Sequence, residues 1–286
     1  NSRRDHYGSA GRAGLCVFAT PRCKQRVVVR MIRVEKAAFR YRDDWVFRNV
    51  GFELAKGQTA AILGPNGRGK TTLLKSIVGL LPLATGTAET YGRIGYVAQK
   101  NDLAFSYRVL DIVVMGRAAH VGMFRTPGLK DYRIARETLE RLGISGFAER
   151  IYTQLSGGER QLVMIARALA SECEILILDE PTSALDFSNQ ALILEVLGRI
   201  SKADGLTVLM TTHVPQHAQQ LADMVLLMKG AEDQDWGFAA DMLTEEKLEA
   251  LYGVPVKSFE VEHQGKTAST LVPLFVLRPR PSPNLP

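Results

Sequence analysis

The chain has 286 residues, of which 46% are hydrophobic and 23% are charged. That composition is typical of a globular protein with a substantial core. No run approaches the roughly 18 apolar residues of a membrane-spanning helix, and the three cysteines are too scattered for a disulfide framework or a zinc site (Cys16, Cys23 and Cys173).

The formal net charge of +6 arises in residues 1–30, which hold seven basic residues and one acid. Because acids and bases balance over the rest of the chain, its body is not expected to bind nucleic acid. Residues 1–30 also lack periodicity. We expect them to be a disordered or non-native extension, translated upstream of a start at Met31, and an Arg-rich transit peptide is the alternative.

Ordered structure is predicted from Met31, where residues 31–36 alternate as in a strand. Short strands then continue to about Leu63, with turns at residues 42–44 and 56–57.

Residues 64–71 match the phosphate-binding pattern G-x-x-x-x-G-K-T. An apolar strand pattern (59–63) precedes the loop and a helical pattern (72–78) follows it, as such a loop requires. Its glycines allow backbone N–H groups to turn toward phosphate oxygens, and the helix adds the positive end of its dipole. Lys70 supplies a charge for the β- and γ-phosphates, and the Thr71 hydroxyl can bind Mg²⁺. The loop predicts binding of a nucleoside triphosphate.

The rest of the chain alternates between strand and helix patterns after a largely helical block at residues 108–171. Such alternation predicts an α/β fold with a mainly parallel sheet, into which the helical block is inserted. The predicted elements are a turn at 86–87, a strand at 94–99, a helix at 131–142, strands at 175–178, 207–210 and 224–228, and helices near 189–200 and 216–221.

Two carboxylates, Asp179 and Glu180, end the apolar strand at 175–178. Ligand sites lie at the carboxyl ends of parallel strands. Asp179 is therefore a candidate for holding Mg²⁺, usually through water, and Glu180 for polarising an attacking water.

Ser156, Gly157 and Gly158 precede a second helical pattern with apolar residues at 162, 165 and 169. A serine and glycines at a helix start present backbone N–H groups, so this segment is a second candidate anion site.

The phosphate loop, the Ser-Gly-Gly segment and the Asp-Glu strand end recur in this order in the ATP-binding subunits of ATP-binding cassette (ABC) transporters, which residues 31–262 resemble. The resemblance extends to Gln99 as the Q-loop, Asp186 in the D-loop at 183–186, and His213 as the switch histidine. Tyr41 resembles the aromatic that stacks on adenine, although Phe39 and Trp45 lie close enough to take that role.

The resemblance implies an ABC ATPase fold, in which a P-loop NTPase core carries an N-terminal antiparallel β subdomain and a helical subdomain at about 100–165. Residues 263–286 would form a C-terminal strand and a disordered Pro-rich tail. The resemblance also implies ATP and Mg²⁺ as cofactors. Each ATP would be held between the phosphate loop of one copy and the Ser-Gly-Gly segment, called the signature, of the other. The implied nucleotide contacts are Tyr41, Gly64, Pro65, Asn66, Gly67, Arg68, Gly69, Lys70, Thr71, Thr72, Ser156, Gly157, Gly158 and Asp186. The implied metal ligands are Thr71, Gln99 and Asp179, and the implied catalytic residues are Glu180, His213 and Gln99.

Two residues depart from the family pattern. Glu159 stands where many members have glutamine, and Arg68 where serine or cysteine is common. Both side chains can point away while backbone groups bind phosphate, so we expect ATP hydrolysis to be retained.

Three further segments (113–117, 148–152 and 243–253) resemble the group that imports iron–siderophore, haem, cobalamin or related metal chelates. That resemblance implies a homodimer on the cytoplasmic face of the plasma membrane, with two integral-membrane permease subunits, a periplasmic or surface substrate-binding protein and no nucleic acid. A soluble ABC ATPase without a transport role, or an importer subunit for another substrate class, remains the alternative.

Overall fold

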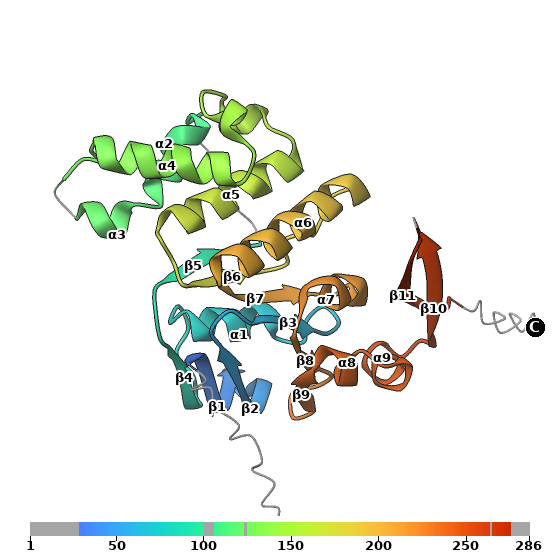
Figure 1. The fold of residues 1–286 in the computed structure, drawn as a ribbon. Coiled ribbons are helices and arrows are strands. Elements are labelled where there is room, and N and C mark those ends of the chain that lie inside the picture. Colours follow the sequence, from blue (N-terminus) through green and yellow to red (C-terminus); the bar gives the residue numbers. More distant parts are fainter. Residues whose placement is uncertain (1–28, 100–105, 123–124, 264, 276–286) are drawn as a thin grey trace, which may run out of the picture.

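The computed structural model describes residues 29–99, 106–122, 125–263 and 265–275 (Figure 1). The expectations for residues 1–28 and for the Pro-rich tail from residue 276 therefore lie outside the described residues. The remaining part contains two sheets that share a core, a helical lobe and a C-terminal hairpin.

A six-stranded sheet forms the centre of the molecule, in the order β5-β6-β7-β3-β8-β9. Neighbouring strands from β5 to β8 pair in parallel, and β9 adds an antiparallel edge. This confirms the mainly parallel sheet. The strands are β3 (Thr59–Leu63), β5 (Ile94–Val97), β6 (Ile175–Leu178), β7 (Thr207–Thr212), β8 (Met224–Met228) and β9 (Gln234–Phe238).

Strands β3 and β6 are buried along their whole length, which is why they read as continuous apolar runs. Their residues alternate between two hydrophobic clusters. Ala61 and Leu63 face the cluster that includes the core helices, whereas Ala60 and Ile62 face the cluster that includes α1 (Lys70–Ile77). Since Leu63 pairs with Thr212 and Leu178 with Met210, the carboxyl ends of β3, β6 and β7 lie side by side.

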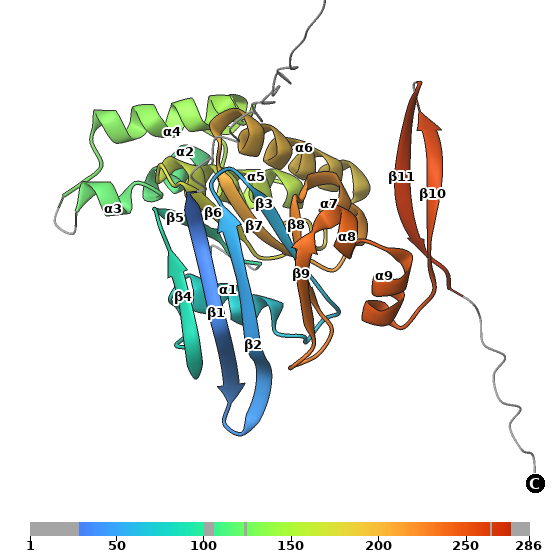
Figure 2. The same cartoon turned by 60° about the horizontal axis from the view of Figure 1, so that its bottom comes forward.

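The N-terminal strands form a separate antiparallel sheet in the order β2-β1-β4, as expected (Figure 2). It contains β1 (Arg30–Tyr41), β2 (Asp44–Ala55) and β4 (Thr85–Thr90). Apolar residues of β1 and β2 share one core with Leu73 and Leu74 of α1 and with Ile177 of β6. The first helix is therefore packed between the two sheets, and its N-terminus is fixed from both sides.

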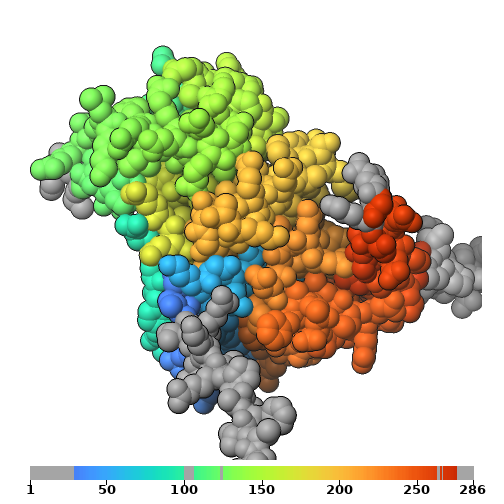
Figure 3. Space-filling model, viewed as in Figure 1, coloured from blue at the N-terminus to red at the C-terminus, as the bar shows by residue number. Residues whose placement is uncertain are grey.

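A helical lobe covers the upper part of the molecule in the orientation of Figures 1 and 3. It contains α2 (Val109–Met115), α3 (Ala118–Val121), α4 (Leu129–Arg141), the short 3₁₀ turns η1 (Ser145–Phe147) and η2 (Tyr152–Gln154), and α5 (Gly157–Ala170). At the end of α2, a Cβ on Gly116 would lie 2.0 Å from the Arg167 carbonyl oxygen of α5. The next residue, Arg117, is buried and forms ion pairs with Asp131 and Glu172. Helix packing and ion pairing therefore account for two residues of the 113–117 segment, Gly116 and Arg117.

Helices α6 (Phe187–Asp204) and α7 (Pro215–Leu221) pack against the central sheet, and α8 (Ala239–Met242) and α9 (Glu245–Tyr252) follow its edge. The last described element is a hairpin of β10 (Val256–His263) and β11 (Lys266–Pro273), which stands out from the body (Figures 1 and 2). The boundary proposed at residue 262 falls inside this hairpin.

Neither the hairpin nor the polar edge strand β9 is evident from sequence periodicity. Across the described segments, no helix combines the length and the apolar character needed to cross a membrane.

Candidate functional site

The phosphate loop runs from the end of β3 to the start of α1 and is held close to its neighbours. A Cβ on Gly64 would lie 2.6 Å from the Met228 carbonyl oxygen of β8, so this position has no room for a side chain. Gly67 and Gly69 have φ angles of 79° and 85°, which favour glycine. A Cβ on Gly69 would also lie 2.5 Å from a methyl carbon of Val46. The loop conformation therefore depends on its glycines.

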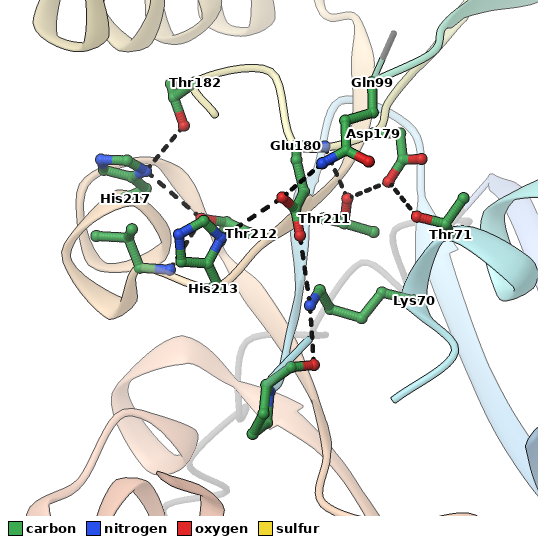
Figure 4. A network of polar contacts seen from close by, with 12 residues as sticks. Lys70, Thr71, Gln99, Asp179, Glu180, Thr182, Thr211, Thr212, His213 and His217 are labelled. Atoms are coloured by element: carbon green, nitrogen blue, oxygen red, sulfur yellow. Dashed lines mark hydrogen bonds and ion pairs between the residues drawn. The ribbon is translucent and has the colours of Figure 1, made fainter. Parts of the chain in front are cut away.

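Lys70 is 5% exposed and its amine turns back over the loop (Figure 4). Nζ donates to the carbonyl oxygens of Gly64 at 2.7 Å and Pro65 at 3.1 Å, and lies 3.4 Å from Oε1 of Glu180. Burial lowers the pKa of Lys70, while the carboxylates of Glu180 and Asp179 oppose that shift. A nearly buried cation beside loop amides fits the phosphate chain of a nucleotide.

Asp179 is 1% exposed at the end of β6, and two hydroxyl groups fix its carboxylate. Its Oδ1 accepts from Thr71 Oγ1 at 3.0 Å and from Thr211 Oγ1 at 2.8 Å (Figure 4). Nearby, burial raises the pKa of Tyr96 to about 12, and Asp179 adds to that shift. A hydroxyl and a carboxylate oxygen at hydrogen-bond distance form a suitable donor set for Mg²⁺.

Glu180 occupies a strained backbone position, with a φ angle of 47°. Its backbone N–H donates to Thr211 Oγ1 at 2.8 Å, which holds this conformation. Its Oε2 accepts from Gln99 Nε2 at 3.0 Å and lies 3.5 Å from Nδ1 of His213 (Figure 4). Side chains from α1 and from the ends of β5, β6 and β7 thus converge on one carboxylate.

A cavity of about 430 Å³ opens beside these groups. Tyr41 is 55% exposed and lines it, whereas Phe39 is buried and Trp45 lies between the guanidinium groups of Arg40 and Arg48. Tyr41 is therefore the aromatic of the three that faces the cavity. Its lining residues are Tyr41, Val46, Asn66, Gly67, Gly69, Lys70, Thr71, Thr72, Gln99 and Glu180.

The Ser-Gly-Gly segment forms the start of α5. Ser156 is its N-cap, with its hydroxyl oxygen accepting from the Glu159 backbone N–H at 3.3 Å. In return the Glu159 carboxylate accepts from the Ser156 N–H at 2.7 Å and pairs with Arg150 at 2.8 Å. The hydrogen bonds from the Ser156 N–H and from Arg150 lower the pKa of the Glu159 carboxylate. Glu159 thus completes a capping box, and the first-turn N–H groups of Gly157 and Gly158 lack carbonyl partners within the helix.

Gly158 also brings α5 close to the start of α6. A Cβ there would lie 2.1 Å from Oδ1 of Asn189, whose side-chain amide donates to Asp186 at 3.0 Å. Asp186 is the N-cap of α6 and accepts from the Asn189 backbone N–H at 2.8 Å. The starts of α5 and α6 therefore pack as one unit.

The structure does not bring all predicted site residues together within one copy. Of the residues that it describes, none of Ser156, Gly157, Gly158 and Asp186 lines the cavity beside Lys70. Arg68 lies exposed at the tip of the loop. One copy thus provides a phosphate loop, paired acids and hydroxyls in one place, and a separate helix N-terminus.

Three contributors to the site were missed by the sequence reasoning. Thr211 connects Asp179 and Glu180, Val46 supports Gly69, and His217 bonds to Thr182, two residues after Glu180. The polar pair Thr211-Thr212 at the end of an apolar strand is a signal for the first, whereas the other two depend on tertiary contacts.

Comparisons with known proteins agree with this geometry. The family model described as ABC transporter matches residues 47–183. The chain is 39% identical over 247 residues to the molybdate import ATP-binding protein MolC of Haemophilus influenzae, covering 86% of this chain and 97% of MolC. It is 34% identical over 242 residues to a protein of Helicobacter pylori assigned as an iron chelatin transport ATP-binding protein, covering 80% of this chain and 95% of that protein.

Among solved structures, the chain is similar to a transporter assigned to the metal-chelate type of ABC transporter and captured in an inward-facing conformation. The match has a TM-score of 0.83 and 39% identity, and covers 86% of this chain and 98% of the other. The chain belongs to the ABC transporter family, as an ATP-binding subunit that hydrolyses ATP.

Proposed function

We propose that two copies of this chain bind a pair of Mg·ATP molecules head to tail and energise import of a metal chelate or a related metal-containing anion. The observation that carries this proposal is the separation within one copy of two phosphate-binding features. Lys70 and the loop line one cavity, while Ser156 and Gly157 lie exposed at a helix start outside it, where the first-turn N–H groups have no carbonyl partner within the helix. A second copy, turned to face the first, would complete each site.

In this arrangement the chain's own groups have distinct tasks. The amide groups of the loop and Lys70 bind the phosphates, and Tyr41 stacks on the base. Thr71, Asp179 and Gln99 hold Mg²⁺, which neutralises charge on the phosphates when bound. Glu180 takes a proton from the attacking water, and His213, 3.5 Å away, contacts the terminal phosphate and orients that carboxylate.

Amide groups of the partner's signature segment would neutralise the phosphates from the opposite side. Hydrolysis would then remove the group that both copies share and allow the pair to separate. Such a ligand-controlled opening is how we propose that ATP drives the transport cycle.

The cargo class rests on the relatives. The names of two of them state molybdate import and iron chelatin transport, and the solved relative is assigned to a metal-chelate transporter. An iron–siderophore, haem or cobalamin remains within the proposed class, as does molybdate. The cassette itself is not proposed to touch the cargo.

Transport requires membrane partners, which we propose to be two permease subunits that hold the cassette at the cytoplasmic face of the membrane, with a substrate-binding protein on the other side. An apolar groove of about 680 Å³ between α2 and α3 offers a docking site for a permease segment, and Met115 in it is 40% exposed. Val114, Ala118, Val121 and Pro127 also line this groove.

Uptake by cells that carry or lack this chain tests the function. Labelled molybdate, ferric siderophore, haem and cobalamin are supplied separately, and the expected result is loss of uptake of one of them. Complementation with the Lys70→Ala variant should fail because ATP binding is lost, and with Glu180→Gln because hydrolysis is lost. Unchanged uptake of all four compounds in the cells that lack the chain would contradict the proposal.

A further inference from the structure

His217 lies in the first turn of α7, beside His213 and on the side away from Asp179 and Thr71 (Figure 4). The residue is 6% exposed, and none of the roles described above uses its side chain. Buried histidines require hydrogen-bond partners, so the contacts of this ring indicate what it does.

The ring connects two segments of the site. Its Nδ1 lies 3.1 Å from Thr182 Oγ1 and 3.5 Å from Thr212 Oγ1, and both threonines are buried. Thr182 follows Glu180 by two residues, and Thr212 immediately precedes His213. The ring thus links the segment that carries the proposed base to the segment that carries the switch histidine.

The surroundings of the ring favour its neutral form. Thr212 Oγ1 accepts from the Val214 backbone N–H at 3.1 Å and keeps its own O–H. A hydroxyl group both donates and accepts, so Thr182 and Thr212 can hold Nδ1 in either neutral tautomer of the ring. Burial, with a further contribution from His213, lowers the pKa of His217, which agrees with a neutral ring.

We propose that His217 is a positioning residue for ATP hydrolysis, because it fixes the segment of Glu180 relative to that of His213 through Thr182 and Thr212. This inference rests on the proposed roles of Glu180 and His213. The two segments are already joined by the hydrogen bond from the Glu180 N–H to Thr211 Oγ1 at 2.8 Å, and His217 provides a second link between them. The hydrogen-bond partners of the ring, Thr182 and Thr212, are not among the residues proposed to bind phosphate or adenine. Its loss should therefore change turnover and leave nucleotide affinity intact.

Steady-state ATP hydrolysis by the full-length protein tests the inference with two variants. His217→Leu keeps much of the volume and removes the ring nitrogen that bonds to Thr182, so kcat should fall by about tenfold, the size expected from one buried hydrogen bond, with KM within about twofold. His217→Asn places a side-chain oxygen near the position of Nδ1 and should recover most of the lost kcat. Thermal unfolding of each variant establishes that the assay temperature lies below its transition.

A double-mutant cycle provides the second arm. Thr182→Val removes the hydroxyl partner of the ring, and combining it with His217→Leu should cost no more than the larger single effect, because both changes break the same link. Additive losses of kcat would overturn the proposal, as would wild-type kcat in His217→Leu. A rise in KM in His217→Leu that His217→Asn does not reverse would overturn it as well. Thr182→Val keeps the test decisive if His217→Leu does not fold.

Glu180→Gln, assayed alongside, separates the two levels of the argument. Normal turnover in Glu180→Gln would remove the assigned base and with it the proposed mechanism. Abolished turnover in Glu180→Gln together with wild-type kcat in His217→Leu would overturn the role of His217 alone.

Discussion

Replacing Thr211 by valine should damage both stability and catalysis, because one hydroxyl group serves both acids of the site. Thr211 is fully buried, accepts from the Glu180 N–H at 2.8 Å and donates to Asp179 at 2.8 Å. Valine has nearly the same shape and lacks the hydroxyl. The variant leaves the part-buried Glu180 N–H without its acceptor, at about 1 kcal/mol, and removes a buried donor to the Asp179 carboxylate, at about 1.5–3 kcal/mol.

Together these losses amount to about 2.5–4 kcal/mol, or roughly 5–16 °C in the midpoint of thermal unfolding. The activity should fall further than the stability alone explains. Glu180 is held at a φ angle of 47° by the lost hydrogen bond, and a non-glycine residue relaxes from this region when it is released. We expect kcat to fall by about tenfold or more at a temperature where the variant is folded.

Thr207→Val is the matched control, since Thr207 is equally buried at the opposite end of the same strand. It accepts from the Gly57 N–H at 3.0 Å, and Gly57 is partly exposed, so water can replace the lost partner at a cost of about 1 kcal/mol. Differential scanning calorimetry and steady-state ATP hydrolysis compare the two variants. Equal kcat values for Thr211→Val and Thr207→Val would refute the reasoning.

Two further predictions concern packing and pH. Gly158→Ala should displace Asn189 and weaken the contact between α5 and α6. The rate of ATP hydrolysis should fall, and the unfolding free energy should fall by about 1–3 kcal/mol. In the control Gly146→Ala the added methyl group meets no atom within 4 Å, so neither quantity should change. The same loss of activity in both variants would contradict the packing argument. Because burial lowers the pKa of His217 in the folded state, the unfolded chain binds its proton more readily as pH falls below the ordinary value of 6.5. The unfolding midpoint should therefore fall more steeply below pH 6.5 in the wild type than in His217→Asn, and identical slopes in pH-dependent calorimetry would contradict this.

Much of the central sheet is predictable because buried parallel strands leave a simple pattern. The strands at 59–63, 175–178 and 224–228 have the expected bounds, and each is a short apolar run between polar or glycine-rich segments. The glycines of the phosphate loop are equally direct, since the backbone conformation itself requires them, and their spacing identifies Lys70 at the start of the helix.

Other features depend on residues that meet only after folding. The polar strand β9 forms by pairing with β8, and the C-terminal hairpin is fixed at its base by α7 and α9, for example through Gln216 and the Leu271 carbonyl oxygen. Thr211 acquires its role from Glu180, 31 residues earlier in the chain, and His217 from Thr182, 35 residues earlier. Sequence periodicity carries no information on such contacts.

The central claim is that each ATP site is shared between two copies, and mixing two inactive variants tests it most directly. Lys70→Ala removes the loop cation. Gly157→Asp places a carboxylate at the exposed start of α5, where the helix tolerates it and a phosphate would be repelled. In a head-to-tail pair of one Lys70→Ala copy and one Gly157→Asp copy, both lesions fall in one site and the other site is intact.

Equimolar mixing should therefore restore nucleotide binding in about a quarter of all sites, because half of the pairs are mixed and each mixed pair has one intact site. The measurement is retention of a slowly hydrolysed, labelled ATP analogue by the mixture and by each variant alone. Slow release of the analogue from the mixture, with fast release from either variant alone, is the predicted result. A mixture that retains no more nucleotide than the separate variants would contradict the shared site.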